Sequence, residues 1–101
     1  MNILATDVGI FRIITVSVTD DTLTAELSDG RTISVPAAWY PRLVHASQEE
    51  RENWRAVGNG HGIHWELLDE DISVENLLEG RSSGETQKSF KKWLEMRKAG
   101  K

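Results

Sequence analysis

Three short runs of alternating apolar and polar residues between positions 13 and 35 constrain the fold more than any other feature of the sequence. Successive side chains in a strand point to opposite faces, so this period of two predicts strands. The apolar members that we expect to point inward are Ile14, Val16, Val18, Leu23, Ala25, Leu27, Ile33 and Val35. Asp29 and Gly30 between the last two runs predict a tight hairpin turn, because both residues tolerate a positive φ. The pattern therefore predicts a three-stranded antiparallel meander with one buried and one solvated face.

The residues that follow the third run are expected to be helical. Pro36 ends that run, and Pro41 fits a helix only in its first turn, where its missing N–H does not matter. Ser47 and Glu50 have the spacing of a capping box, in which each side chain accepts a hydrogen bond from a backbone N–H at the helix start. We therefore expect a short charged helix over residues 48–57.

A further alternating run, IHWEL at residues 63–67, predicts a fourth strand that extends the same sheet. Its inward members would be Ile63, Trp65 and Leu67. The three acids at 69–71 fit a turn before a helix better than a calcium loop, because the ligand order of an EF-hand is missing. Ser73 as N-cap and Gly80 as a left-handed terminal residue then bracket a short helix.

A last helix is predicted over residues 84–99, where Ser82 and Glu85 form a second candidate capping box at its start. Its apolar stripe consists of Phe90, Trp93 and Leu94. The basic residues on roughly the opposite side are Lys88, Lys91, Lys92 and Lys98. The helix is therefore amphipathic, with a basic outer face.

The chain has 101 residues, which is the size of one domain. We expect a single α+β domain over residues 1–101, in which an antiparallel three- to four-stranded meander sheet carries short helices and the C-terminal amphipathic helix on one face. Its parts would be the meander at 13–35, a helix-helix-strand-helix segment at 36–80, and a linker with the last helix at 81–101.

The cellular location that we expect is the cytoplasm. No apolar run reaches the roughly 20 residues that a membrane span needs, and the first ten residues lack the pattern of a signal peptide. The sequence has no cysteine, which excludes disulfides, thiolate metal sites and a cysteine nucleophile.

Charge is divided unevenly along the chain, whose net charge is −4. Residues 1–80 hold five Arg and fourteen Asp or Glu, a net charge of −9, whereas residues 81–101 hold seven Lys or Arg and two Glu, a net charge of +5. The acidic body disfavours nucleic acid at long range. The basic terminal segment fits phosphate, an acidic partner or the chain's own body.

Several of these stretches together resemble a known bacterial family. The segments DGRTISVP, WYPRL, GIHW followed by LDEDISVE, and the SF, W and L of the last helix are similar to the longer members of domain of unknown function family 2442 (DUF2442). The resemblance covers nearly the whole chain from about Val16 and implies a small α+β domain of bacterial or phage origin with no established activity. Members of this family are associated with a second small family in gene pairs of toxin–antitoxin type, which implies an antitoxin-like or partner-binding role.

Two groups of residues are candidates for partner binding. Trp39, Tyr40 and Arg42 lie at a strand-to-helix junction and combine aromatic and Arg side chains, which are enriched in binding hot spots. Packing in the core is the alternative for the two aromatics. The second group is the basic face formed by Lys88, Lys91, Lys92 and Lys98, for which a simply solvated helix face is the alternative.

The segment GNGHGIHW at residues 58–65 invites a phosphate or metal interpretation. Its glycines are spaced by two and precede a strand, which does not match a P-loop or a dinucleotide fingerprint, so we expect a structural turn between helix and strand. His61 and His64, with His45 and the acids at 69–71, could supply metal ligands. If residue 63 begins a strand, however, His61 and His64 point to opposite faces.

The function that we expect is a non-catalytic bacterial protein–protein interaction module, of which the antitoxin-like half of a small gene pair is one form. Its partner would be a protein encoded nearby, and a homodimer also fits. One alternative is a nucleic-acid-binding regulator that uses the basic C-terminal helix, and another is a metal-dependent enzyme that uses His61 and His64. We expect no catalytic residue, no cofactor and no membrane contact.

Overall fold

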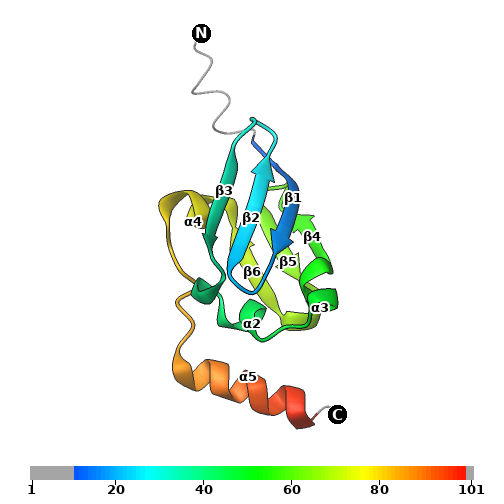
Figure 1. The fold of residues 1–101 in the computed structure, drawn as a ribbon, viewed down its shortest axis with the longest axis vertical. Helices are drawn as coiled ribbons and strands as arrows, with labels where there is room; N and C mark the ends of the chain where they lie inside the picture. Colours follow the sequence, from blue (N-terminus) through cyan, green and yellow to red (C-terminus); the bar gives the residue numbers. More distant parts are fainter. Residues whose placement is uncertain (1–10, 100–101) are drawn as a thin grey trace.

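The computed structural model describes residues 11–99, which form two three-stranded antiparallel sheets, several short helices and a longer C-terminal helix (Figure 1). The strands are β1 (Ile13–Val18), β2 (Thr22–Leu27), β3 (Thr32–Pro36), β4 (Trp54–Val57), β5 (Gly62–Trp65) and β6 (Glu70–Ser73). The helices are η1 (Ala37–Trp39), α2 (Pro41–Val44), α3 (Gln48–Glu52), η2 (Glu66–Leu68), α4 (Val74–Glu79) and α5 (Gln87–Ala99), of which η1 and η2 are 3-10 helices. The α+β class is confirmed. The expectation about a signal peptide concerns residues that lie outside the described part of the chain.

The first sheet, in the order β1-β2-β3, confirms the predicted meander. One predicted inward residue is wrong: Ile14 is 59% exposed, because a β-bulge between Ile13 and Thr15 shifts the register and turns Ile13 inward instead. The hairpin between β2 and β3 also differs from the predicted turn. Only Gly30 has a positive φ, of 95°, and Leu27 and Arg31 close the loop through a backbone hydrogen bond, as in a longer turn that ends in a glycine bulge.

The strand over 63–65 does not extend the first sheet, as we expected, but is the centre of a second sheet in the order β4-β5-β6. The predicted helix over 48–57 ends at Glu52, and its last four residues form β4, whose Trp54 pairs with Trp65. The capping box itself is confirmed, since Ser47 Oγ accepts from the Glu50 N–H at 3.1 Å and the Glu50 carboxylate accepts from the Ser47 N–H at 2.9 Å. The helix therefore begins where predicted but ends early, because residues 54–57 form a strand that pairs with β5.

The turn that joins β4 to β5 contains three consecutive left-handed residues, Gly58, Asn59 and Gly60. The predicted structural turn is therefore confirmed, although it joins two strands rather than a helix and a strand. The Gly60 carbonyl accepts a hydrogen bond from the Ile13 N–H at 2.9 Å, which ties the second sheet to β1. A Cβ at Gly60 would lie 2.7 Å from Cβ of Arg12, so only glycine allows this close approach.

The acids at 69–71, expected as a turn before a helix, mostly form β6, and Asp69 alone is a left-handed residue, with φ of 53°. Leu67, expected to point inward, lies in η2 and is 57% exposed, because the chain leaves the strand after Trp65. Ser73 and Gly80 begin and end α4 as predicted.

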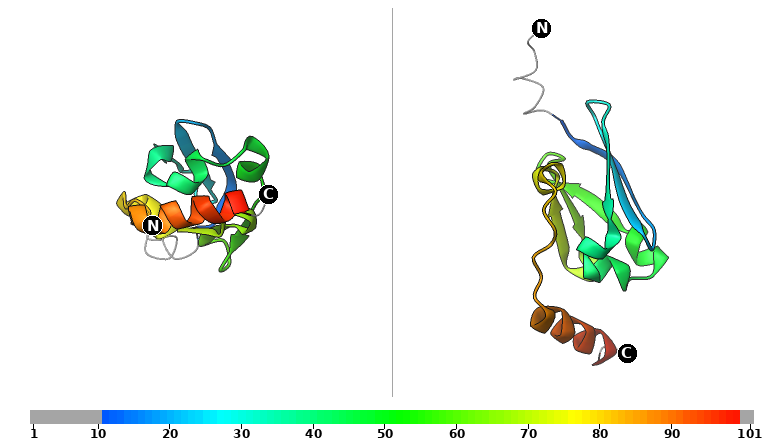
Figure 2. Two further views of the ribbon diagram at one scale, coloured as in Figure 1. Left: turned by 90° about the horizontal axis from the view of Figure 1, so that it is seen from below. Right: turned by 60° about the vertical axis from the view of Figure 1, so that its left-hand side comes forward.

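The core lies between the two sheets, which face each other as layers (Figure 2). Its largest fully buried side chain is Trp65, whose indole N–H donates to the carbonyl of Arg51 at 3.0 Å. Arg51 is itself buried and donates to the carbonyls of Leu43 and Val44, which satisfies the C-terminal end of α2. This network joins α2, α3 and the second sheet into one unit.

Helix α5 lies beneath one end of the two layers rather than on a sheet face (Figures 1 and 2). It begins at Gln87 and not at residue 84, because Thr86 Oγ1 accepts from the Ser89 N–H at 3.0 Å and so caps the helix. The second predicted capping box is wrong, since the Glu85 side chain bonds to α2 instead. None of the helices in the described part of the chain is long and apolar enough to cross a bilayer.

Candidate functional site

The junction between the body and α5 is centred on Arg42 of α2. Its Nε and Nη2 donate to the carboxylate of Glu85 at 2.7–3.1 Å, and its Nη1 donates to the carbonyls of Leu68 and Asp69 at 3.1 and 3.0 Å. The side chains of Arg42 and Glu85 are only 15% and 9% exposed. The hydrogen bonds from Arg42 hold the pKa of Glu85 below its ordinary value. Arg42 thus joins three segments that are distant in the sequence.

A second carboxylate, that of Glu70 in β6, is buried beside this pair at 8% exposure. Burial raises its pKa to about 7, and although Arg42 opposes the shift, the negative charge of Glu85 adds to it. Glu70 also lines a small pocket of about 230 Å³ together with Arg42, Glu85 and residues of the linker before α5. Several carboxylates therefore share one guanidinium at this end of the body.

Trp93 is the residue through which α5 itself is seated. Its indole N–H donates to the Leu68 carbonyl at 3.2 Å, and the guanidinium carbons of Arg42 and Arg97 lie 5.2 and 4.7 Å from the centre of its ring. Arg97 also donates to Glu50 of α3 at 3.0 Å, and Phe90 packs against the ring of His45. These contacts hold α5 against α2, α3 and η2.

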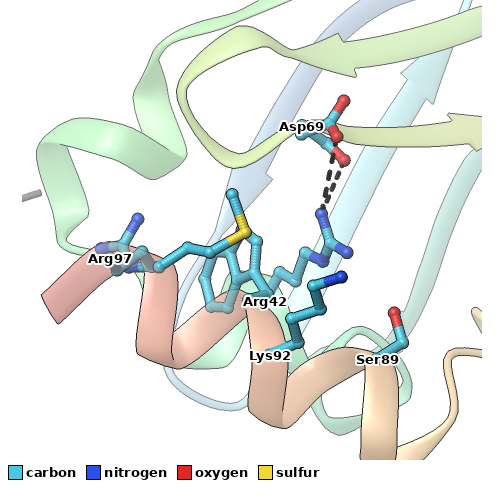
Figure 3. A pocket seen from close by; sticks show the side chains of 7 residues that line it. Arg42, Asp69, Ser89, Lys92 and Arg97 are labelled. Atoms are coloured by element: carbon cyan, nitrogen blue, oxygen red, sulfur yellow. Dashed lines mark hydrogen bonds and ion pairs between the residues drawn. The ribbon is translucent and has the colours of Figure 1, made fainter. Parts of the chain in front are cut away.

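A pocket of about 340 Å³ opens between this helix and the body (Figure 3). Trp93 and Met96 give it an apolar wall, and Arg42, Lys92, Arg97 and Asp69 place charged groups around it. Ser89 contributes a hydroxyl on the side nearer the linker. The arrangement combines an apolar surface with an excess of positive charge, which is a chemistry suited to binding.

The predicted partner-binding residues divide into two sets in the structure. Tyr40 is 2% exposed, and its hydroxyl donates to the Arg81 carbonyl at 3.1 Å, so it holds the linker and offers no contact surface. Trp39 is half-buried against the core, and Arg42 is engaged as described above. The four lysines, by contrast, are all exposed on α5. Of the predicted residues, the pocket brings together Arg42 and Lys92.

The two histidines considered as metal ligands lie in different surroundings. His64 sits on the outer face of the second sheet, with Nδ1 2.6 Å from Asp71 and Nε2 3.1 Å from Glu66, and the hydrogen bond to Asp71 raises its pKa. His61 instead packs against the ring of Phe11 at 5.4 Å. Across residues 11–99, no three His, Asp or Glu side chains gather in a way that could hold a metal ion.

Several residues of this site were not found by sequence reasoning. The spacing of Glu85 from Ser82 predicts a helix cap instead, and no motif of the sequence points to Arg97. Glu70 is one of the three acids at 69–71 that predict a turn. The sequence did carry one usable signal for Glu70, since it alternates with Ile72, as an inward residue of a strand would.

Comparisons with known proteins agree on a family and a fold. The model of the family described as "Protein of unknown function (DUF2442)" matches residues 13–83, and a comparison with curated proteins gives no match. A crystal structure of a protein of unknown function from Rhodospirillum rubrum is similar with a TM-score of 0.62 and 26% identity, over 77% of this chain and 94% of that one. An NMR structure of an uncharacterised protein from Chromobacterium violaceum has the same fold, with a TM-score of 0.61 and 23% identity over 72% and 69% of the two chains.

Proposed function

The chain belongs to the DUF2442 family, and on this basis we propose that it is a non-catalytic protein–protein interaction module of the bacterial cytoplasm whose contact surface is the outward face of α5. The family match ends at residue 83, before α5 begins. The helix therefore lies outside the matched residues, although its SF, W and L are among the residues that resemble the longer members of the family.

One observation carries the proposal: α5 has no fully buried residue, yet several polar contacts fix its position against the body. A helix that served only to cover the core would bury an apolar stripe. Here the stripe is half-buried, and the opposite side presents the exposed lysines. The helix therefore lies exposed at the end of the body, where a partner protein can reach it.

The charge on this helix specifies the kind of partner. The outward face of α5 carries Lys88, Lys91, Lys92 and Lys98 against the single carboxylate of Glu95, while the body is strongly acidic. Complementary charge steers association and excludes partners of like charge. The partner should therefore present an acidic surface, and the face of the body that lies away from α5 should repel it.

The gene pairing implied for the family gives the partner to try first, the product of the adjacent gene, with this chain in an antitoxin-like role. A tagged copy of the full chain is co-expressed with that product and recovered. We expect co-purification and a change in the neighbour's effect on growth. If nothing co-purifies and growth is unchanged, the proposal is wrong.

A pair of charge-reversal variants locates the contact. Lys88→Glu combined with Lys91→Glu should weaken the complex at least about five-fold, since each exposed ion pair contributes up to about 1 kcal/mol. Arg31→Glu combined with Arg55→Glu changes the net charge equally, at exposed sites in the β2–β3 turn and in β4, and serves as the control. Equal weakening by both double variants would show that net charge alone matters.

The same lysines favour a second candidate function, a nucleic-acid-binding regulator. Four exposed cations on one helix can neutralise phosphates, and such binding weakens steeply with salt. A gel shift with duplex DNA at low salt tests it directly. Lys88→Glu, Lys91→Glu and Lys92→Glu together should abolish retention, and no retention of the unaltered protein would dispose of this function.

A further inference from the structure

We infer that the pocket between Arg42 and α5 binds an acidic peptide segment through one large apolar side chain, with carboxylates on either side of it held by Lys92 and Arg97. The inference rests on the proposed function, because it names the part of a protein partner that this chain would recognise. It adds a specific site, since nothing in the lysine face alone selects an apolar side chain.

The apolar half of the recognition comes from Trp93 and Met96. Met96 is 65% exposed at the mouth of the pocket, on the same side of the helix as the half-buried indole. An exposed Met beside a Trp is an adaptable apolar surface, because the thioether side chain is flexible and polarizable. A volume of about 340 Å³ is at the small end of ligand pockets, which suits one inserted side chain rather than a cofactor.

The carboxylates of the peptide would be recognised by cationic side chains that still have free hydrogen-bond donors. Arg42 donates from Nε and Nη2 to Glu85 and from Nη1 to the carbonyls of Leu68 and Asp69, so it contributes little further hydrogen bonding. Arg97 uses only Nη2, toward Glu50, and Lys92 has no ion-pair partner among residues 11–99. Lys92 and Arg97 are therefore the groups that can take up carboxylates from a bound segment.

The geometry favours a peptide over a nucleic acid at this position. Single-stranded nucleic acid is bound by stacking its bases on aromatic rings. The guanidinium groups of Arg42 and Arg97 already lie over the ring of Trp93, so a base cannot stack flat on it. An inserted apolar side chain needs only the part of Trp93 that lines the pocket beside Met96.

The test uses two short peptides that differ only in charge, acetyl-Glu-Leu-Glu-amide and acetyl-Gln-Leu-Gln-amide, added to the full chain. The chain has only two methionines, Met1 and Met96, so methyl labelling gives one reporter at the pocket. We expect a saturable shift of the Met96 methyl resonance with the acidic peptide, at millimolar concentrations, and a several-fold weaker response to the neutral one. No shift of Met96, or an equal response to both peptides, overturns the inference.

Two neighbouring lysines supply matched variants. Lys92→Glu should lower the affinity for the acidic peptide about three-fold or more. Lys91→Glu, on the same helix but outside the pocket, should leave that affinity nearly unchanged. Equal weakening by both variants overturns the inference in favour of general charge attraction. The inference is also overturned if a short DNA duplex displaces the acidic peptide and binds more tightly than the peptide.

Failure here is distinguishable from failure of the proposed function. If the adjacent gene product binds and its affinity is not changed by Lys92→Glu, the proposed interaction module is supported and the peptide pocket is wrong. If the peptides bind as expected but that product does not, the pocket stands and the assigned partner is wrong.

Discussion

The guanidinium of Arg42 and the carboxylate of Glu85 form a bidentate ion pair across 43 positions of the sequence, with a shortest contact of 2.7 Å. Arg42 belongs to the body, and Glu85 lies two residues before the start of α5. Bidentate pairs of this kind fix orientation as well as distance. The pair therefore determines where α5 and its lysines are presented.

Replacing Glu85 should loosen α5 without unfolding the body. Glu85→Gln keeps the shape but removes the charge, which should cost about 1–2 kcal/mol of docking free energy. Hydrogen exchange of the α5 amides should then become roughly ten-fold faster, while exchange in the two sheets stays unchanged. Glu95→Gln, on the exposed side of α5, is the control. Unchanged exchange in α5 would show that the ion pair does not hold the helix.

Glu70 should make the stability of the protein fall as the pH rises toward neutrality. Its pKa is about 7 in the folded protein but near 4.5 when exposed, so the folded state holds the extra proton between these values. The free energy of unfolding then decreases with rising pH across that window, by on the order of 3 kcal/mol in total, and levels off above it. Chemical denaturation at several pH values measures this slope.

The variant Glu70→Gln isolates that contribution, because an amide does not titrate. It should remove the decrease between about pH 4.5 and 7 and leave the protein more stable than the original at pH 8. Glu26→Gln, at an exposed position of β2, should keep the original slope. A Glu70→Gln variant with an unchanged slope would place the titrating group elsewhere.

The β4–β5 turn should tolerate a side chain at one glycine and not at the other. Gly60→Ala combines a φ of 84° with a contact of 2.7 Å to Arg12, whereas Gly58 has a φ of 59° and open space around it. We expect Gly58→Ala to cost about 1 kcal/mol and Gly60→Ala at least twice as much. Thermal unfolding of the two variants compares them. Equal losses would mean that the close approach of β1 is not rigid.

The pKa of His64 should lie above the ordinary value of histidine, because Asp71 accepts a hydrogen bond from its ring. NMR titration of the imidazole reports its pKa directly. Asp71→Asn should lower that pKa more than Glu66→Gln does, since Glu66 is the weaker of the two influences. The raised pKa also means that this pair stabilises the fold at low pH and loses its effect as the pH passes the folded value. If Glu66→Gln has the larger effect, the assigned hydrogen bond is wrong.

The parts of the fold that sequence reasoning predicted are those with local signals. The alternation in β1 to β3, the Ser47 capping box and the Ser73 and Gly80 boundaries each depend on residues a few positions apart. The second sheet was missed because β4 follows directly after a correct helix start. Residues 54–57 show no alternation of buried and exposed side chains, since only Trp54 and Val57 are half-buried. The pairing of β4 with β5 depends instead on a turn of three left-handed residues.

At the candidate site, too, local sequence signals do not predict contacts between residues that are distant in the sequence. Arg42 and the lysines were named from residue type and position, which requires no knowledge of contacts. The spacing of Glu85 from Ser82 predicts a local capping role, whereas its partner in the structure is Arg42, 43 positions away. The burial of Tyr40 and Glu70 likewise follows from the packing of two sheets and not from their neighbours in sequence.

The central claim is that the outward face of α5 is the surface that meets the partner. The most direct measurement is an NMR titration of the ¹⁵N-labelled full chain with the purified product of the adjacent gene. The account predicts that the perturbed amides concentrate in α5, around Lys88, Lys91 and Lys92, with the outer faces of both sheets unaffected. Perturbations confined to the sheets, with α5 unchanged, would contradict it.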